Sequence, residues 1–179
     1  MTEPPFLLAN NPAGSYWDDL LDDAHLVARA YRDRGWEVLV VEPEDVSPTM
    51  GDRPGLTALL SDTAYDTVET LLSRESPSTT FTDLEHSRRS VRDAVFLLLV
   101  ERDLSSQQAI VLPLYYFIRA AEPVLERVAT AGEMPVYLRP RSATDSVSFV
   151  HTDPSLFQPG PDRHRRLLTD GVTVAGERN

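Results

Sequence analysis

Ala94-Val95-Phe96-Leu97-Leu98-Leu99-Val100 is the longest uninterrupted apolar run of the chain. It is far shorter than the roughly 20 residues that a membrane-spanning helix needs. A short run that is apolar at every position is typical of a central β-strand buried on both faces. We therefore expect a sheet with this strand near its centre.

A second apolar segment, Ala109–Tyr116, follows the polar connection Glu101–Ser106. Because this link is short, the two predicted strands are expected to pair antiparallel. Pro113 has no N–H to donate to a neighbouring strand, so we expect one free flank or a bulge at this position.

Helical periodicity recurs in three segments, and strand patterns recur in five more. The predicted helices cover residues 15–34, 61–74 and 119–131, and Gly35 and Gly132 end two of them. The further predicted strands cover residues 36–41, 56–60, 80–86, 136–138 and 146–150, and a loop covers 43–54. Segment 80–86 also allows a helix that continues to Arg92.

These elements predict an α/β (α+β) fold with a mixed, mostly antiparallel sheet of five to seven strands, packed in two layers with about three helices. We expect an extended lead-in over residues 1–14, a single domain over 15–157 and a flexible tail over 158–179. Ser15 and Asp18 have the spacing of a capping box at the start of the first helix.

The charge balance predicts an unusual surface. Acidic residues number 28 against 17 basic ones, the net charge is −11, and every basic residue is arginine. In strong salt the repulsion between carboxylates is screened, and arginine retains its bidentate pairing with them. The composition therefore predicts a protein of a salt-filled cytoplasm; the alternative is an ordinary acidic protein from a GC-rich genome.

The same composition excludes several kinds of chemistry. Without lysine the chain has no phosphate-loop lysine and no Schiff base, and without cysteine it has no thiolate site. We expect no secretory or membrane segment and no nucleic-acid partner, because binding to nucleic acid needs a basic surface. Arg163-His164-Arg165-Arg166 is the one basic cluster. It could contact RNA, an acidic partner or carboxylates of its own chain.

Asp18, Asp22 and His25 lie about one helical turn apart and form the first candidate metal site. The alternative is an acidic first turn that faces solvent, because these residues lie opposite the apolar stripe. We expect no cofactor.

Asp83, Glu85, Glu101 and Asp103 lie near the ends of predicted neighbouring strands and form the second candidate site. The order of helices and strands resembles the restriction-endonuclease-like core, in which two carboxylates bind Mg²⁺ and position a water. The lysine of that core is absent here. A hydrolase would require the four carboxylates to converge.

Tyr115, Tyr116 and Arg119 form a candidate ligand pocket or dimer interface, because adjacent strand residues point to opposite faces and one tyrosine is expected to be accessible. Core packing of both rings is the alternative. His151 lies close to Asp153 in the sequence, which would allow a proton shuttle, although a simple hydrogen bond is the more common role.

The segments Asn11–Asp19, Gly35-Trp36 and Leu112–Tyr116 resemble a family of uncharacterised small acidic proteins from haloarchaea. The resemblance spans residues 10–157 and implies a halophilic source and a cytoplasmic location. It implies no functional residues. The leading hypothesis is a non-catalytic domain that acts by association, as a homodimer or by binding a protein partner or a small ligand; the alternative is a metal-dependent hydrolase or nuclease.

Overall fold

The computed structural model describes residues 11–73, 83–161 and 163–164. In these residues the helices are α2 (Ser15–Asp33), α3 (Asp62–Ser73), α4 (Ile118–Ala131) and the short 3-10 helix η1 (Pro154–Phe157). The strands are β1 (Glu37–Val40), β2 (Asp45–Thr49), β3 (Gly55–Leu60), β4 (Asp83–Val91), β5 (Ala94–Asp103), β6 (Gln108–Phe117), β7 (Met134–Pro140), β8 (Val147–His151) and β9 (Arg163–His164).

The strands form two mixed sheets, a five-stranded one in the order β1-β6-β5-β4-β9 and a four-stranded one in the order β2-β3-β7-β8. Only the β1–β6 and β3–β7 pairs are parallel among the described strands. The expected α+β class, with three α-helices and mostly antiparallel strands, is confirmed. The sequence did not reveal that the strands are divided between two sheets.

The predicted central strand is confirmed. β5 is buried at all ten positions, and it pairs antiparallel with β6 along its whole length. It continues through Glu101, Arg102 and Asp103, which the sequence had suggested as a polar connection. The correction is important for function, because it places three charged residues inside the sheet.

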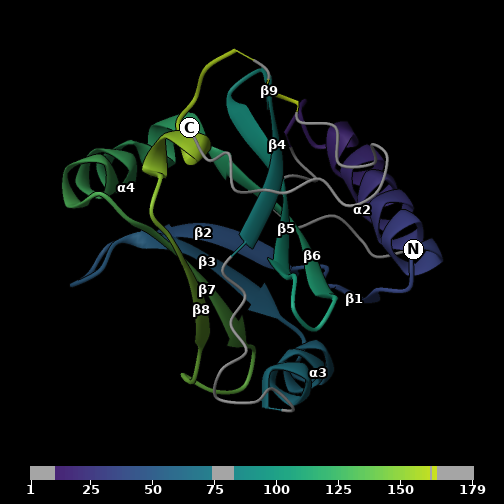
Figure 1. Cartoon of the computed structure of the whole chain (residues 1–179). Coiled ribbons are helices and arrows are strands. Elements are labelled where there is room, and N and C mark those ends of the chain that lie inside the picture. The colour runs from purple at the N-terminus through teal and green to yellow at the C-terminus, as the bar shows by residue number, and fades with distance from the viewer. Residues whose placement is uncertain (1–10, 74–82, 162, 165–179) are drawn as a thin grey trace.

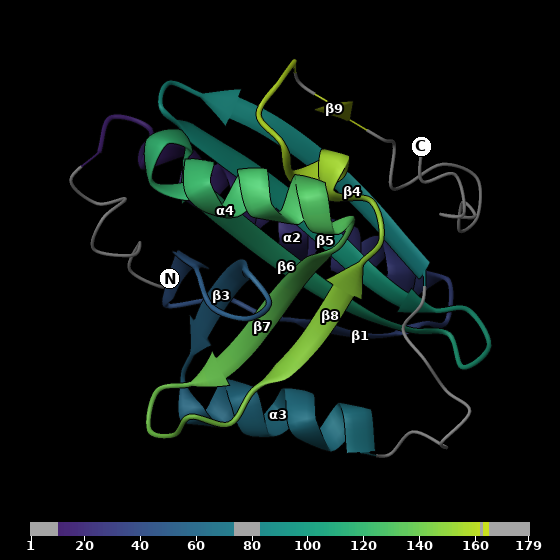
Figure 2. The same ribbon diagram turned by 90° about the vertical axis from the view of Figure 1, so that its left-hand side faces the viewer.

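Helix α2 covers one face of the five-stranded sheet, where it contacts β1, β6 and β5. Its buried stripe is the predicted one, running from Trp17 to Tyr31 at helical spacing. The four-stranded sheet and α4 lie on the opposite side (Figure 1), and in the turned view α4 crosses in front of the first sheet with α2 behind it (Figure 2). Helix α3 packs on β7 and β3.

The pairing of β1 with β6 ends beside Pro113. The N–H groups of Glu37 and Val41 donate to Gln107 and Val111 of the β6 segment, so odd-numbered residues of β6 face β1. The pairing of β1 with β6 ends at Val111. The next residue of β6 that faces β1 is Pro113, which has no N–H to donate to β1. The expected free flank is therefore confirmed, but it is buried in the interior, and β6 is not an edge strand.

Other expectations need correction. The segment 43–54 was predicted to be a loop but contains β2, an edge strand in which Pro48 is tolerated because one flank needs no partner. The helical alternative for 80–86 is wrong from Asp83 onward, because β4 begins there. The predicted capping box is also not formed, since Gly14 is the N-cap residue of α2 and no side chain caps the helix.

Both predicted glycine stops are confirmed. Gly35 and Gly132 have φ angles of +88° and +77°, a left-handed conformation that glycine adopts without strain. Most of the lead-in (residues 1–10) and of the tail (165–179) lies outside the described residues. Near the start of the tail, Arg88 donates to the carbonyl of Pro161.

Candidate functional site

The four candidate carboxylates do not converge. In the β4–β5 pair Asp83 lies opposite Arg102, and Glu101 lies opposite Leu84. Residues directly opposite each other share a face of the sheet, and neighbours along a strand alternate. Asp83 and Glu85 therefore lie on the α2 face, whereas Glu101 and Asp103 lie on the other face. A hydrolase site would require these four carboxylates to converge, and this condition is not met.

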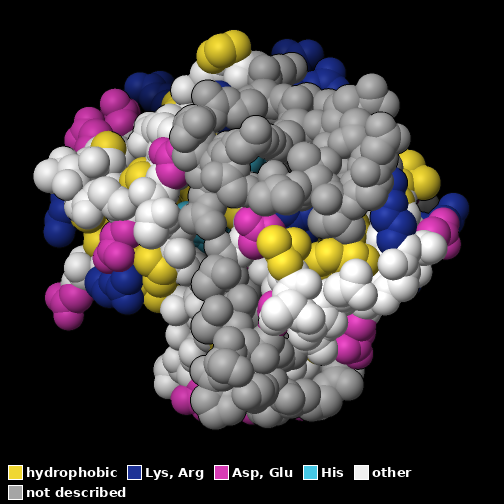
Figure 3. All heavy atoms as spheres, viewed as in Figure 1, with side chains coloured by type: hydrophobic (Ala, Val, Ile, Leu, Met, Phe, Trp, Pro, Cys, Tyr) yellow, Lys and Arg dark blue, Asp and Glu magenta, His cyan; other side chains and the backbone are white. Residues whose placement is uncertain are grey.

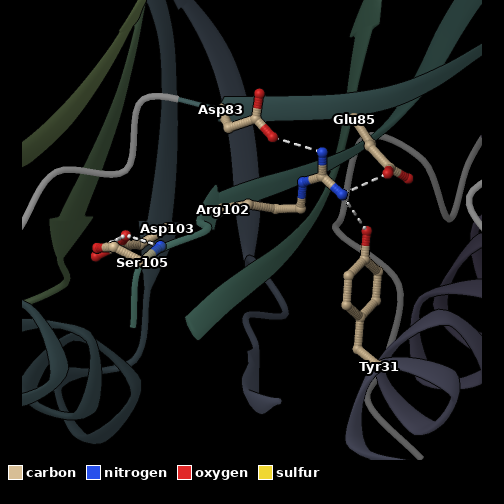
Figure 4. A network of polar contacts seen from close by, with 6 residues as sticks. All are labelled: Tyr31, Asp83, Glu85, Arg102, Asp103 and Ser105. Atoms are coloured by element: carbon tan, nitrogen blue, oxygen red, sulfur yellow. Dashed lines mark hydrogen bonds and ion pairs between the residues drawn. The ribbon is translucent and has the colours of Figure 1, made fainter. Parts of the chain in front are cut away.

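On the α2 face the carboxylates surround a buried arginine. The Arg102 side chain has no exposed surface; its Nη2 donates to Asp83 at 2.5 Å and its Nη1 to Glu85 at 2.6 Å. Nη1 also lies 3.2 Å from the hydroxyl of Tyr31 in α2. Figure 4 shows these three groups turned toward the guanidinium, with Asp103 and Ser105 apart from them.

The Arg102 cluster joins β5 to β4 and to α2 inside the core. Removing one partner of such a buried pair typically costs about 3–5 kcal/mol, because the remaining charge is left without compensation. Burial, and next the charge of Glu85, raise the pKa of Tyr31 well above its ordinary value, so this hydroxyl stays protonated. The Arg102 cluster therefore links strands β5 and β4 with helix α2.

On the opposite face Glu101 pairs with a histidine of the second sheet. The Glu101 carboxylate contacts His151 Nε2, and His151 Nδ1 lies 2.9 Å from the carbonyl oxygen of Met134. Both side chains are buried, and the ring of His151 packs beside Phe157. The pair links β5 of the first sheet with β8 of the second.

The two contacts of His151 restrict where the protons of its ring lie. A carbonyl oxygen only accepts, so Nδ1 must donate to Met134. The bond to Glu101 then needs one further proton, which lies either on Nε2 or on the carboxyl group. The hydrogen-bonded role that was the more common expectation for His151 is therefore the one observed. Asp153, the partner in the alternative shuttle, instead accepts from the backbone N–H of Ser155 at the start of η1.

Asp103 is a structural residue at the end of β5. Its Oδ1 accepts from the hydroxyl of Ser105 at 2.7 Å and from the backbone N–H of the same residue at 2.9 Å. Desolvation acts to raise the pKa of Asp103, but these bonds and those from Ser106 outweigh it and hold the pKa below its ordinary value. The carboxylate therefore stabilises the turn into β6.

The expectation that either Tyr115 or Tyr116 is accessible is wrong, because both rings are buried. Tyr115 packs edge-on against Trp17 and donates to Asp45 of β2 at 2.9 Å, and Tyr116 donates to the carbonyl of Phe157. These contacts occupy both hydroxyls. Arg119 is exposed.

The first candidate metal site is not formed in the described residues, where no group of three His, Cys, Asp or Glu side chains could bind a metal ion. Asp22 and His25 are exposed on α2, and His25 instead lies 3.6 Å from Glu42 just after β1. In the basic cluster Arg163 and His164 form β9 beside β4, and their side chains lie outside what the structure describes.

The structure adds one surface that sequence reasoning missed. β1 is one of the two edge strands of its sheet among the described residues, and its apolar residues Val38, Leu39 and Val40 are all partly exposed. Val38 and Val40 direct their backbone groups away from β6, since Glu37 and Val41 bond to it. We call Val38–Val40 the β1 edge. The sequence predicts a strand for these residues, but their edge position depends on long-range pairing with β6.

An exposed arginine borders this edge. Arg32, in the last turn of α2, donates from Nη2 to the carbonyl oxygen of Val38 at 2.9 Å. One outward acceptor of the β1 edge is thereby satisfied within the chain. Charged side chains that cover a strand edge are a common protection against uncontrolled pairing.

A model for a "Family of unknown function (DUF7529)" matches residues 8–159, so the chain belongs to this family. The match includes all three α-helices and strands β1–β8. No curated protein and no solved structure matches the chain. In the described residues, no helix has both the length and the hydropathy needed to span a bilayer.

The Glu101–His151 pair can be tested by a double-mutant cycle. We expect Glu101→Met and His151→Leu each to lower the free energy of unfolding by about 3 kcal/mol, because each leaves a buried polar partner unsatisfied. The double variant should lose clearly less than the sum. Urea unfolding at constant salt measures all four proteins, and additive losses would show that the two side chains do not act together.

Alkaline titration tests the buried hydroxyls. Burial raises the pKa of Tyr31, Tyr115 and Tyr116, with the charge of Asp45 as a further cause at Tyr115. A raised folded-state pKa contributes stability that is present below the unfolded value, near 10, and is lost as pH rises above it. We expect these three tyrosines to ionise only as the protein unfolds, measured by tyrosinate absorbance together with circular dichroism. Ionisation of all six in the folded state would contradict this.

Proposed function

We propose that this member of the DUF7529 family is a non-catalytic association domain and that the β1 edge is its binding surface. The observation that carries the proposal is the position of three consecutive, partly exposed apolar residues on an edge strand of the described five-stranded sheet. An exposed strand edge provides main-chain donors and acceptors, and its side chains provide apolar contact. Such a surface fits binding to another polypeptide.

The internal pairing of the charged groups supports association over catalysis. Asp83 and Glu85 bind Arg102, Glu101 binds His151, and Asp103 binds Ser105. Each interaction stabilises a junction between elements. These carboxylates are thus engaged inside the protein, and the proposal rests on the β1 edge as an exposed apolar surface among the described residues.

We further propose that the domain works in a salt-rich cytoplasm. The net charge is −11, and all 17 basic residues are arginine. On the face seen in Figure 3, acidic and arginine side chains are interspersed around the periphery. At about 1 M salt the Debye length falls to roughly 3 Å, so repulsion among exposed carboxylates is largely screened.

Thermal unfolding in increasing potassium chloride tests the salt adaptation. We expect the midpoint to rise by more than about 10 °C between dilute buffer and molar salt, because screening relieves carboxylate repulsion in the folded chain. Circular dichroism provides the measurement, and a molar solution of uncharged sucrose controls for general exclusion effects. The same midpoint in dilute and molar salt would exclude the adaptation.

The substitution Val40→Lys tests the binding surface. A charge within the β1 edge should weaken association by about tenfold or more, because the lysine would have to be desolvated on pairing. Val150→Lys is the matched control: Val150 is 40% exposed and lies on β8, an edge of the other sheet.

Light scattering over a range of concentrations measures self-association, and binding to immobilised wild-type chain measures the same contact independently. Val150→Lys should behave as the wild-type chain does. If Val40→Lys associates as strongly as the wild type while remaining folded, the β1 edge is not the binding surface.

A further inference from the structure

We propose that the partner at the β1 edge is a second copy of this chain, paired antiparallel about a two-fold axis at Leu39, with Arg32 of each copy bound to Glu42 of the other. This inference rests on the proposed function and specifies its partner. It would join two five-stranded sheets into one continuous sheet.

The backbone geometry of β1 restricts the register, and the apolar residues of the edge select one. Val38 and Val40 are the residues whose N–H and C=O groups point away from β6, as the bonds of Glu37 and Val41 to the β6 segment require. In an antiparallel pair, two opposed residues of this kind exchange both hydrogen bonds. Even-numbered residues of the two copies must therefore oppose each other. Among the registers of this kind, the pairing of Val38 with Val40, and the reverse, opposes all the apolar residues of the edge and places Leu39 opposite its own counterpart.

This register leaves no like charges directly opposed. Glu37 lies opposite Val41 of the second copy, and Glu42 lies opposite Trp36. The apolar residues of the edge face one another across the axis, so partly exposed surface is removed from water on both copies. A register shifted by one residue would direct the paired backbone groups of one strand toward β6 and away from the partner.

Charge complementarity favours a second copy. Arg32 lies beside the β1 backbone at Val38, and Glu42 lies on the α2 side of the sheet, where it contacts His25. The two-fold axis places Glu42 of one copy opposite Trp36 of the other, on the same side as Arg32. Two symmetric Arg–Glu pairs therefore flank the apolar contact.

Arg32 has a different partner in each state. In the single chain its guanidinium covers the carbonyl oxygen of Val38, the acceptor that the N–H of Val40 in the second copy needs. On pairing, the guanidinium moves to Glu42 of the second copy and frees this oxygen. A short interface of this kind belongs to the weak class, below about 1,200 Å² of buried surface, so the dimer forms and dissociates with concentration.

Charge reversal tests the arrangement, with sedimentation equilibrium at the lowest salt at which the wild-type chain is folded. Arg32→Glu and Glu42→Arg should each weaken self-association by about tenfold or more, because each creates two like-charged contacts. An equimolar mixture of the two variants should restore dimers to within about threefold of the wild-type affinity, since every contact is then between opposite charges.

A second pair of variants controls for net charge and folding. Arg53→Glu and Glu133→Arg reverse an exposed ion pair next to β3 and β7 of the other sheet, whose Arg53 Nη2 and Glu133 Oε2 lie 3.0 Å apart. These variants change the total charge equally and should leave self-association unchanged. Circular dichroism of each variant shows that it is folded.

The outcomes separate this inference from the proposed function. If Val40→Lys weakens association but the mixed reversals do not restore it, the edge binds and the proposed register is wrong. A wild-type chain that stays monomeric at every concentration, in dilute and in molar salt, overturns the second copy as partner. Recovery in the mixture, with unaffected controls, supports the dimer.

Discussion

The burial of β5 on both faces is the constraint on which the structure depends. Because the strand continues through its charged end, each of those charges needs a partner inside the protein. Arg102 obtains partners from β4 and α2, and Glu101 obtains one from β8. The elements that surround β5 are thus connected to it by polar bonds that require specific positions, whereas apolar packing alone would tolerate small shifts.

Elements with strong periodicity were predictable from the sequence. The buried residues of α2 recur with the helical period, and the continuous apolar run at the centre of β5 is typical of a buried strand. The charged end of β5 was not predictable, because Glu101-Arg102-Asp103 has the composition of a surface connection and is buried only through distant partners. β2 was missed for a related reason: Asp45 and Pro48 are typical of loops, and only pairing with β3 makes the segment a strand.

The candidate site shows how far local reasoning extends. Grouping Asp83, Glu85, Glu101 and Asp103 correctly identified the charged end of two neighbouring strands. The four side chains nevertheless lie on two different faces of the sheet. The sequence predicted that the strand ends at Val100, so the alternation of side chains along a strand, which separates Glu101 from Arg102, was not expected there. The β1 edge was beyond reach for another reason. Which strand lies outermost depends on the order of pairing, and β1 pairs with a strand about seventy residues further along the chain.

Pro113 has a consequence for the path of the chain. Where its missing N–H ends the ladder, the polypeptide leaves the first sheet after Val41 and enters β2 of the second. Pro113 of β6 thus lies beside the branch point between the sheets, where it has no N–H to donate to the carbonyl of Val41. The length of β1, and with it the size of any surface on its outer side, is limited by a residue on the neighbouring strand.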